Sequence, residues 1–578
     1  MPLTTPPAVV LSAVSFAWPD GDPVLSGLTA AFNAGRTGLI GANGAGKSTL
    51  LRLIAGQLAP TAGAITTTGR VGYLPQTVVL DTGAAVADLL GVRRQLDALR
   101  AITAGDADPR HFDALGDDWD VEARAEAALA EHGLDGLGLD RPVGRLSGGE
   151  AMLAALAGLK LGGAPITLLD EPTNNLDRAS RQRLRAVVAA WRGALVVVSH
   201  DLALLELMDE TAELRAERLT VFGGPYTAYR EHLDREQAAA EQALRTAQQT
   251  LKAERRQRIE ADERLARRDR YGRTAMEQKR QPKIIMNARR RAAQVSAGQL
   301  RGQLDDRVEA ARAAVAREEE RIRRDARIRI SLPDPDVPAG RRLAEFRDAR
   351  GEPLIIQGPQ RVALTGRNGI GKTRLLEALI RSADGKRAPD RGEATAEPPE
   401  WSLPATAPPA GGAAPAQPPG HGAASAAPHA RTRRVGYLPQ RLDHLDDAAS
   451  LIDVVRSAAP NASTEQVRAN LARFLFRADS VDRPIGALSG GERFRAALAR
   501  LLLREPPCQL LVLDEPTNNL DLASVGELVD ALAAYHGGLI AVSHDDDFLA
   551  RLGVDTWLTL DENGLHVGAP PADAETMP

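Results

Sequence analysis

Two glycine-rich segments have the residue types and spacing of phosphate-binding loops. They read Gly41-Ala-Asn-Gly-Ala-Gly-Lys-Ser48 and Gly366-Arg-Asn-Gly-Ile-Gly-Lys-Thr373. Glycines in this pattern let backbone N–H groups curl around phosphate oxygens, the lysine reaches the terminal phosphates, and the hydroxyl binds magnesium. The predicted nucleotide-binding residues are Gly41, Asn43, Gly44, Gly46, Lys47, Ser48 and Thr49, and in the second segment Gly366, Asn368, Gly369, Gly371, Lys372 and Thr373.

An acidic pair follows an apolar run in each half of the chain, Asp170–Glu171 and Asp514–Glu515. Behind a phosphate loop, the first carboxylate suits the magnesium shell, and the second suits a general base or water-positioning group. Taken alone, such a pair is more often a helix cap or a surface charge. Its position after a phosphate loop favours the catalytic interpretation.

The phosphate loops belong to an internal duplication, because further motifs recur in the same order. VGYLPQ ends at Gln76 and Gln440, LSGGE begins at Leu146 and Leu488, LDEPTNNLD ends at Asp177 and Asp521, and SHD begins at Ser199 and Ser543. Asp170 and His200 are 30 positions apart, as are Asp514 and His544. Apolar runs at 166–169, 194–198 and 362–364 predict buried parallel strands. The fold class is therefore α/β, with two P-loop domains.

The two copies are predicted to be separated by a charged helical hairpin. We expect a first domain at 1–229, a linker at 230–330 rich in Ala, Glu, Gln and Arg, and a second domain at 331–578. Pro282 should divide the linker into two helices, each with a reach of roughly 60 Å. A solvated spacer is the alternative interpretation of this charge-rich stretch.

The second domain contains an insertion. Lys47 and Gln76 are 29 positions apart, whereas Lys372 and Gln440 are 68 apart. The additional residues, at about 382–432, are mainly Ala, Pro and Gly, and have too few large apolar side chains to offset the entropy of ordering. We predict a disordered surface insertion.

Composition excludes several classes of function. No aliphatic run approaches the roughly 18 residues needed to span a bilayer, and the N-terminus has no secretion signal, so a cytoplasmic location without a membrane segment is expected. The single cysteine, Cys508, cannot form an internal disulfide and is predicted to be a core thiol. The net charge of −4 gives no general indication of a nucleic-acid partner.

LSGGE combined with YLPQ, LDEP and SHD resembles the ATP-binding cassette superfamily over both halves. The resemblance implies that the serine-glycine motif of one cassette closes over ATP held by the other, so that one monomeric chain forms both sites. Ser489, Gly490 and Gly491 would then meet ATP on Lys47, and Ser147, Gly148 and Gly149 would meet ATP on Lys372. The resemblance also implies that Gln76 and Gln440 sense the metal, and that His200 and His544 contact the γ-phosphate.

The two predicted sites differ in sequence. Thr49 follows the first phosphate loop, whereas Arg374 follows the second and removes a hydroxyl that the family commonly directs at a phosphate. Phe16 or Trp18 is a candidate to stack on adenine in the first cassette, and Phe346 is a weaker candidate in the second. These differences leave open whether the two ATP sites are equally active.

Tandem cassettes joined by a charged helical linker resemble the ABC-F group of ribosome-associated ATPases. The resemblance implies binding of ATP and Mg²⁺, and action at the ribosomal exit site on peptidyl-tRNA, in ordinary translation or in protection from antibiotics. Residues 264–291 contain eleven Lys or Arg against Asp269 and Glu277, which suits contact with rRNA and tRNA phosphates. The predicted RNA-binding residues are Arg280, Lys283, Arg289, Arg290 and Arg291.

Three other classes of protein share some of these motifs. The motor of a separately encoded membrane transporter is the main alternative, although it needs no basic hairpin between its cassettes. A DNA-repair or chromosome ATPase would place its coiled coil inside one cassette. A purely regulatory nucleotide-binding module is disfavoured because both glutamates and both histidines are present.

Overall fold

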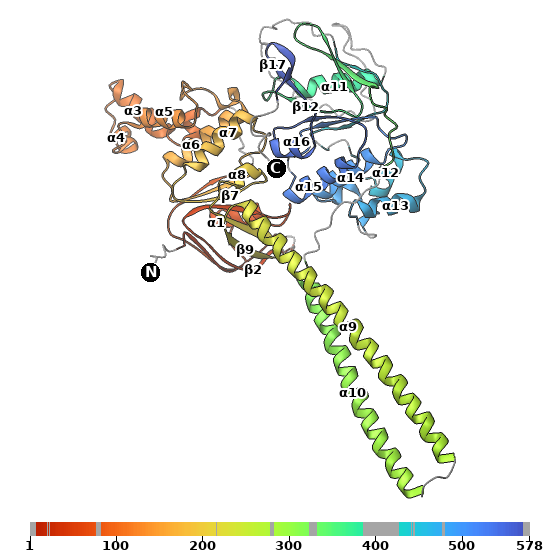
Figure 1. The fold of residues 1–578 in the computed structure, drawn as a ribbon. Coiled ribbons are helices and arrows are strands. Elements are labelled where there is room, and N and C mark those ends of the chain that lie inside the picture. The colour runs from red at the N-terminus through yellow and green to blue at the C-terminus, as the bar shows by residue number, and fades with distance from the viewer. Residues whose placement is uncertain are drawn as a thin grey trace. The chain divides into compact units, whose positions relative to one another are not determined.

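A computed structural model describes residues 7–19, 21, 23–76, 83–215, 217–277, 283–322, 332–384, 427–440, 442, 445–476, 480–518 and 520–569. The chain forms two compact units, which are described separately. The first consists of residues 1–226 and 327–578, and the second of residues 227–326. Figure 1 labels the helices and strands.

Each cassette in the first unit is organised around a six-stranded sheet, in the order β5-β6-β7-β3-β8-β9 and β14-β15-β16-β12-β17-β18. The first five strands of each sheet are parallel, and the last is antiparallel to its neighbour. The first sheet consists of β3 (Gly35–Ile40), β5 (Val71–Leu74), β6 (Ile166–Asp170), β7 (Ala194–Val198), β8 (Glu210–Arg215) and β9 (Arg218–Gly223). The second consists of β12 (Arg361–Thr365), β14 (Val435–Leu438), β15 (Leu510–Asp514), β16 (Gly538–Val542), β17 (Thr556–Asp561) and β18 (Gly564–Gly568).

A small antiparallel sheet accompanies each large one, in the order β2-β1-β4 and β11-β10-β13. Its strands are β1 (Val9–Ala17), β2 (Pro23–Phe32) and β4 (Ala62–Thr67) in the first cassette, and β10 (Arg342–Arg347), β11 (Pro353–Gln357) and β13 (His429–Ala430) in the second. The identical strand orders confirm the predicted fold class of two P-loop domains.

Helices follow the strands as expected for an α/β fold. In the first cassette they are α1 (Lys47–Ile54), α2 (Val86–Leu89), α3 (Arg93–Thr103), α4 (Pro109–Leu115), α5 (Val121–Glu131), α6 (Gly148–Leu161), α7 (Arg178–Ala189) and α8 (Leu202–Leu205). In the second they are α11 (Lys372–Ala383), α12 (Leu451–Ala458), α13 (Thr464–Arg473), α14 (Gly490–Leu502), α15 (Leu522–Ala533) and α16 (Asp546–Arg551). Short 3₁₀ turns, Val143–Arg145 and Ile485–Ala487, precede α6 and α14.

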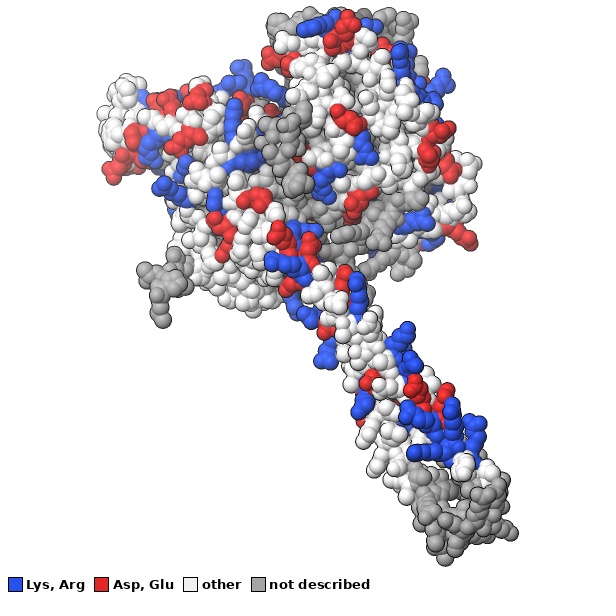
Figure 2. Space-filling model, viewed as in Figure 1, with Lys and Arg blue, Asp and Glu red and all other residues white. Residues whose placement is uncertain are grey.

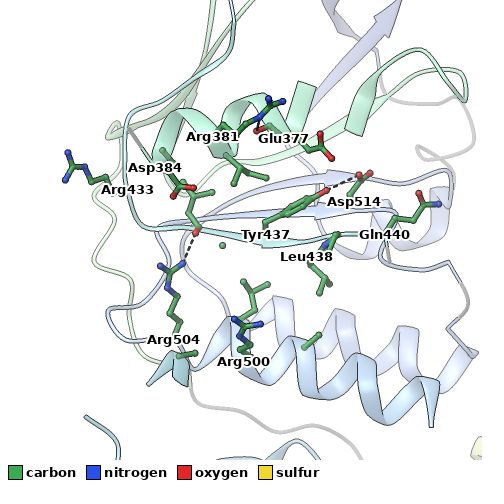
Figure 3. Close-up of a pocket in the computed structure, with 18 of the residues that line it drawn as sticks. Glu377, Arg381, Asp384, Arg433, Tyr437, Leu438, Gln440, Arg500, Arg504 and Asp514 are labelled. Atoms are coloured by element: carbon green, nitrogen blue, oxygen red, sulfur yellow. Dashed lines mark hydrogen bonds between the residues drawn. The ribbon is translucent and has the colours of Figure 1, made fainter. Parts of the chain in front are cut away.

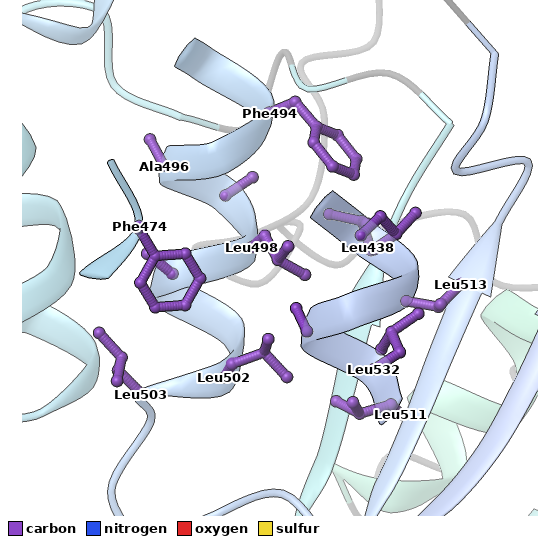
Figure 4. Packing of buried hydrophobic residues seen from close by; sticks show 14 of the residues in the cluster. Leu438, Phe474, Phe494, Ala496, Leu498, Leu502, Leu503, Leu511, Leu513 and Leu532 are labelled. Atoms are coloured by element: carbon purple, nitrogen blue, oxygen red, sulfur yellow. The ribbon is translucent and has the colours of Figure 1, made fainter. Parts of the chain in front are cut away.

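Buried apolar residues hold these layers together. All five residues of β7 (ALVVV) are buried, because a parallel sheet is covered on both faces. In the second cassette, Phe474 and Leu498 pack with Leu513 and Leu532 in one cluster that joins helices to the sheet (Figure 4). The predicted strands at 166–169, 194–198 and 362–364 are therefore confirmed, and Cys508 is a buried core thiol as expected.

The second unit is formed mainly by two long helices, α9 (Tyr226–Glu277) and α10 (Lys283–Arg321). They lie side by side in Figure 1, and two ion pairs connect them: Arg258 with Asp305 at 2.7 Å, and Arg301 with Asp262 at 3.0 Å. Leu304, Val308 and Ala311, spaced four and three residues apart, form a buried stripe on α10. The predicted helical hairpin is confirmed, and Pro282 lies outside the described residues, between the end of α9 and the start of α10.

The predicted bounds of the disordered insertion, about 382–432, extend too far at both ends. Residues 382–384 close helix α11, and Ser382 Oγ accepts a hydrogen bond from the backbone N–H of Ala430 at 2.8 Å. Thr432 Oγ1 donates to Oε1 of Gln509 at 2.7 Å. Residues 427–432 therefore belong to the folded cassette, and the rest of the segment, 385–426, lies outside the described residues.

Membrane insertion has no support among the described helices. Even the longest of these, in the hairpin, are too polar for any to qualify as a bilayer span.

A glycine inside helix α6 gives a test of cassette packing. A Cβ on Gly158 would lie 2.5 Å from the carbonyl oxygen of Leu89 and 2.9 Å from Cα of Leu90. Gly158→Ala should therefore destabilise the chain by about 1–3 kcal/mol, because backbone must move to admit the methyl group.

Gly526→Ala provides the matched control. At this position in helix α15, the nearest atom to an added Cβ is the flexible end of Arg551, 3.9 Å away. This variant should be neutral or gain up to about 1 kcal/mol from the higher helix propensity of alanine. Thermal unfolding followed by circular dichroism compares the two, and equal melting temperatures would contradict the packing at Gly158.

Candidate nucleotide-binding sites

Each phosphate loop joins a central strand to a helix. Strand β3 leads to α1 in the first cassette, and β12 leads to α11 in the second. Gly46 and Gly371 precede these helices with φ values of 96° and 107°, which residues with side chains rarely adopt. The loops therefore present the first N–H groups of a helix together with its positive dipole end, as an anion site requires.

The lysine of each loop is buried and folds back over the loop. Lys47 Nζ donates to the carbonyl oxygens of Gly41 at 2.7 Å and Ala42 at 3.1 Å. Lys372 Nζ does the same with Gly366 at 2.7 Å and Arg367 at 3.2 Å. Burial lowers the pKa of both ammonium groups, although nearby carboxylates oppose the shift. A phosphate is a suitable additional partner for such a buried cation.

A hydroxyl and a carboxylate meet at each predicted magnesium position. Ser48 Oγ donates to Oδ1 of Asp170 at 3.1 Å, and Thr373 hydrogen-bonds to Asp514. Burial raises the pKa of both aspartates. A hydroxyl beside a carboxylate is the arrangement that holds Mg²⁺ together with substrate phosphates, so these residues fit the metal.

A tyrosine supports each of these aspartates, and the sequence analysis did not assign it a role. Tyr73 donates to Oδ2 of Asp170 at 3.2 Å, and Tyr437 donates to Oδ2 of Asp514 at 3.4 Å. Both are the tyrosine of VGYLPQ, three residues before Gln76 or Gln440. The tyrosine occurs in both copies of the motif, and this repetition was the sequence signal that could have indicated a role for it.

The two predicted catalytic glutamates share an unusual backbone conformation. Glu171 and Glu515 have φ values of 50° and 48°, which are strained for residues other than glycine. Each backbone N–H donates to a strand carbonyl, that of Val198 or Val542, at 2.9 Å. Oε2 of each glutamate is buried without a hydrogen-bond partner among the described residues, as expected for an oxygen that would accept from water.

Each SHD histidine lies beside its glutamate. His200 Nε2 is 2.8 Å from Oε1 of Glu171, and His544 Nε2 is 3.3 Å from Oε1 of Glu515. His544 is also 3.1 Å from Lys372 Nζ and 2.9 Å from Oδ1 of Asn368. Burial, followed by the charge of Lys372, lowers the pKa of His544 to about 3, so the imidazole is neutral. Burial raises the pKa of Glu515 to about 7.

Many of the predicted residues of the first site line one cavity of about 420 Å³, although Gly41 and Asp170 do not. Val24, Asn174 and Val198 also contribute to its wall. The predicted residues that line it are Trp18, Asn43, Gly44, Gly46, Lys47, Ser48, Thr49, Gln76, Glu171 and His200. Ser489, Gly490 and Gly491 are not among the lining residues of this cavity.

The two serine-glycine motifs start helices. Ser147 caps α6 and Ser489 caps α14, each by accepting the N–H of the glutamate three residues later. Gly148 and Gly149 form the first turn of α6, as Gly490 and Gly491 do for α14. In both motifs the glutamate carboxylate accepts the serine N–H in return.

Hydrogen bonds connect each phosphate loop to the opposite cassette within the first unit. The backbone N–H of Asn43 donates to Oδ2 of Asp521 at 2.7 Å, and Asn368 Nδ2 donates to the carbonyl oxygen of Asn175 at 2.7 Å. The guanidinium of Arg367 also helps to lower the pKa of Glu150. These bonds involve the LDEPTNNLD motifs. The sequence predicted roles only for the first two acidic residues of each motif, and not for Asp177 or Asp521.

The aromatic residues predicted to stack on adenine differ clearly in their exposure to solvent. Trp18 lines the first cavity, is 37% exposed and is held edge-on by Phe16 at a centroid distance of 5.1 Å. Phe16 itself is buried in the core. Phe346 is the wrong candidate in the second cassette, because it is only 2% exposed and packs in the core as Phe16 does.

The position equivalent to Trp18 is Asp348, two residues after Phe346. Its Oδ1 accepts the N–H groups of Arg350 and Glu352, which fixes a turn. Arg374, the counterpart of Thr49, is exposed. The two cassettes therefore have different side chains around similar phosphate loops.

Of the predicted RNA-binding residues, Arg291 is described in full and is exposed on α10. Lys283, Arg289 and Arg290 lie on the same helix, where only their backbone is described, and Arg280 lies outside the described residues. Gln440 is exposed and follows strand β14.

Comparison with known proteins gives the same assignment as these geometries. The sequence pattern of the ABC transporter family matches residues 25–174 and 353–518. The chain is 32% identical to the tylosin resistance ATP-binding protein TlrC of Streptomyces fradiae, over 92% of this chain and 94% of TlrC. It is 30% identical to the ATP-binding protein Uup of Caulobacter vibrioides, over 94% of this chain and 75% of Uup.

Solved structures show the same fold at lower identity. A complex of the archaeal ribosomal stalk protein aP1 with the archaeal ribosome recycling factor aABCE1 contains a chain that matches with a TM-score of 0.51 and 18% identity, over 96% of this chain and 88% of that one. With two cassettes of ATP-hydrolysing type and relatives that match nearly its whole length, the chain is an ATPase and belongs to the ABC-F family of tandem-cassette ATP-binding proteins.

Proposed function

We propose that this ATPase binds the ribosome at the exit site for tRNA and acts on peptidyl-tRNA, in translation or in protection of ribosomes from an antibiotic. The basic end of the helical hairpin is the observation that carries the proposal. The two ATP sites would control the binding, and the work would take place in the cytoplasm, where ribosomes translate. A single chain would suffice, because it contains both cassettes.

The hairpin concentrates positive charge in a chain whose net charge is −4. Arg264, Arg267, Arg268 and Arg270 are exposed on the last described turns of α9, where Figure 2 shows Lys and Arg gathered. Ion pairs to Glu260 and Glu263 at 3.6–3.7 Å on this surface contribute little. Tyr271 is 79% exposed and is available to stack on a base. This surface suits RNA phosphates rather than an apolar membrane partner.

The residues of each ATP site have complementary chemical roles in this proposal. Glu171 and Glu515 position the attacking water and accept its proton, because each has a buried carboxylate oxygen without another partner. His200 and His544 orient those carboxylates and contact the γ-phosphate. Mg²⁺, bound by Ser48 with Asp170 or Thr373 with Asp514, would neutralise the charge that develops on the phosphates. Gln76 and Gln440 would complete the metal shell.

The cellular role divides into two alternatives. The name of the Streptomyces fradiae relative describes tylosin resistance, which supports the protective role for this chain. A role in ordinary translation uses the same ATP sites and the same basic hairpin. Growth of a strain that expresses the chain, with and without tylosin, separates the two.

The first prediction concerns hydrolysis. Glu171→Gln combined with Glu515→Gln should lower the rate of ATP hydrolysis by at least about 100-fold while leaving ATP binding intact, because an amide cannot accept the proton from water. Phosphate release and binding of a fluorescent ATP analogue measure the two properties. Hydrolysis at the wild-type rate would remove these glutamates from the proposed role.

The second prediction concerns the adenine. Trp18→Ala should weaken ATP binding at the first site by about 1–3 kcal/mol, because a base loses its stacking surface. Asp348→Ala, at the equivalent position of the second cassette, should leave ATP affinity nearly unchanged. Equilibrium dialysis resolves two affinities, and an equal effect of the two substitutions would argue against stacking on Trp18.

The third prediction concerns the ribosome. The Glu171→Gln, Glu515→Gln protein should co-sediment with ribosomes in ATP and inhibit translation, because closed sites cannot reopen. Adding Arg289→Glu, Arg290→Glu and Arg291→Glu should weaken this binding, and each lost phosphate contact should flatten the log–log salt dependence by about one unit.

A second triple variant on the same helix provides the control for that experiment. Arg307→Glu, Arg312→Glu and Arg317→Glu change charge equally, at exposed positions of α10 outside the basic end. They should affect ribosome binding much less. If the locked protein instead pelleted with membranes and left ribosomes unbound, the transporter-motor alternative would replace this proposal.

A further inference from the structure

The second cassette contains a larger cavity, and most of its wall lies outside the predicted ATP site. It has a volume of about 680 Å³ and lies along the edge strand β14, between helices α11, α12 and α14 (Figure 3). One end reaches Thr373 and Asp514 of the second ATP site. The other end lies where Arg504 donates to the carbonyl oxygen of Val435 at 3.0 Å, at the start of the strand. A volume of this size accommodates a drug-sized organic molecule.

Two arginines near the C-terminal end of α14 line this cavity: Arg500 lies on the helix, and Arg504 follows its last residue. Arg500 is partly buried and makes no ion pair or hydrogen bond to the described part of the chain, and Arg504 is its neighbour one turn later. Burial and the charge of Arg504 lower the pKa of Arg500. A guanidinium that is partly removed from water and has no anionic partner favours the binding of an anion that enters the cavity.

The remainder of the wall on this side is apolar. Leu438 of β14, Ala458 of α12, and Ala497 and Leu501 of α14 line the cavity. The other charged residues of the wall have both signs: Glu377, Arg381 and Asp384 lie on α11 or at its C-terminal end, and Arg433 precedes β14 (Figure 3). The cavity therefore has two arginines of one helix end beside an apolar wall, whereas the charges near α11 include both carboxylates and guanidinium groups.

The first cassette shows that this space is not a necessary feature of the fold. Counting from the serine of each LSGGE motif, Gly158 and Gly162 stand where the second cassette has Arg500 and Arg504. At Gly158, backbone atoms of Leu89 and Leu90 lie so close that no side chain fits. At this position the first cassette is therefore filled by closely packed backbone, whereas the second cassette has an arginine beside a cavity.

We propose that the cavity along β14 is a binding site for an amphiphilic organic anion, with its anionic group on Arg500 and Arg504 and its apolar body against Leu438, Ala497 and Leu501. An inorganic anion would leave the apolar wall and most of the volume unused. A neutral apolar molecule would leave Arg500 without a partner. The site does not depend on ribosome binding, because none of its lining residues lies in the helical hairpin.

The probe for this site is 8-anilinonaphthalene-1-sulfonate, whose fluorescence rises in apolar surroundings. The intact chain, saturated with ADP and magnesium to fill the nucleotide sites, should bind one molecule at the cavity. Arg500→Leu should weaken this binding at least tenfold, and Arg500→Gln should weaken it similarly, so that misfolding of one variant leaves the other to decide. Arg473→Leu, at an exposed arginine of α13 in the same cassette, should leave it unchanged.

N-phenyl-1-naphthylamine, which has the same apolar body without the sulfonate, isolates the role of the charge. It should bind the wild-type chain at least tenfold more weakly than the sulfonate, and its binding should not weaken in Arg500→Leu. Circular dichroism confirms that each variant is folded. The proposal fails if the sulfonate binds folded Arg500→Leu and wild type equally, or if the wild-type chain has no saturable site for it.

Discussion

Close approach of each phosphate loop to a neighbouring strand is the constraint on which both nucleotide sites depend. A Cβ on Gly41 would lie 2.4 Å from the carbonyl oxygen of Leu214, and one on Gly366 would lie 2.4 Å from that of Leu560. Both glycines have positive φ, of 152° and 149°. The loop can therefore turn from strand to helix only where a side chain is absent, and this turn places the lysine beneath the helix N-terminus. The other groups of each site are arranged around that position by the order of the parallel strands.

The duplication preserves this backbone while the side chains around it diverge. Trp18 and Asp348 occupy equivalent positions after a buried phenylalanine, yet one faces a nucleotide cavity and the other fixes a turn. Gly158 and Arg500 also occupy equivalent positions. Backbone atoms pack closely against Gly158 in the first cassette, whereas Arg500 lines a cavity in the second. A difference of one side chain can thus change what a site binds without changing the strand order, because the sheet and the phosphate loop supply the framework in both copies.

Sequence reasoning predicted the fold well where chemistry requires fixed residue types. The phosphate loops, the acidic pairs and the fully apolar strands follow from local requirements, and β7 was predicted with its observed bounds. The role of Tyr73 and Tyr437 was missed, because a tyrosine in a strand gives no local sign of a carboxylate brought to it by the next strand of the sheet. Phe346 was assigned wrongly because its burial depends on strands β10 and β11 pairing over the core. The ends of the insertion were missed for a similar reason, since β13 is only two residues long and exists by pairing with β10.

The LDEPTNNLD motif divides its acids between the two cassettes. Asp170 and Glu171 face the site of their own cassette, whereas the last aspartate connects to the other one. Asp521 caps helix α15 through Oδ1 and accepts the N–H of Asn43 through Oδ2, and these bonds lower its pKa despite burial. Asp177 caps α7 in the same way, and hydrogen bonds from Ser180, with a smaller contribution from the N–H of Asn368, lower its pKa despite burial. Each of these carboxylates thus stays ionised while it joins a helix start to the opposite phosphate loop. Because the nucleotide phosphates are predicted to bind through the same loop, we propose that a movement of the loop on ATP binding would be transmitted to the helix that begins at this aspartate.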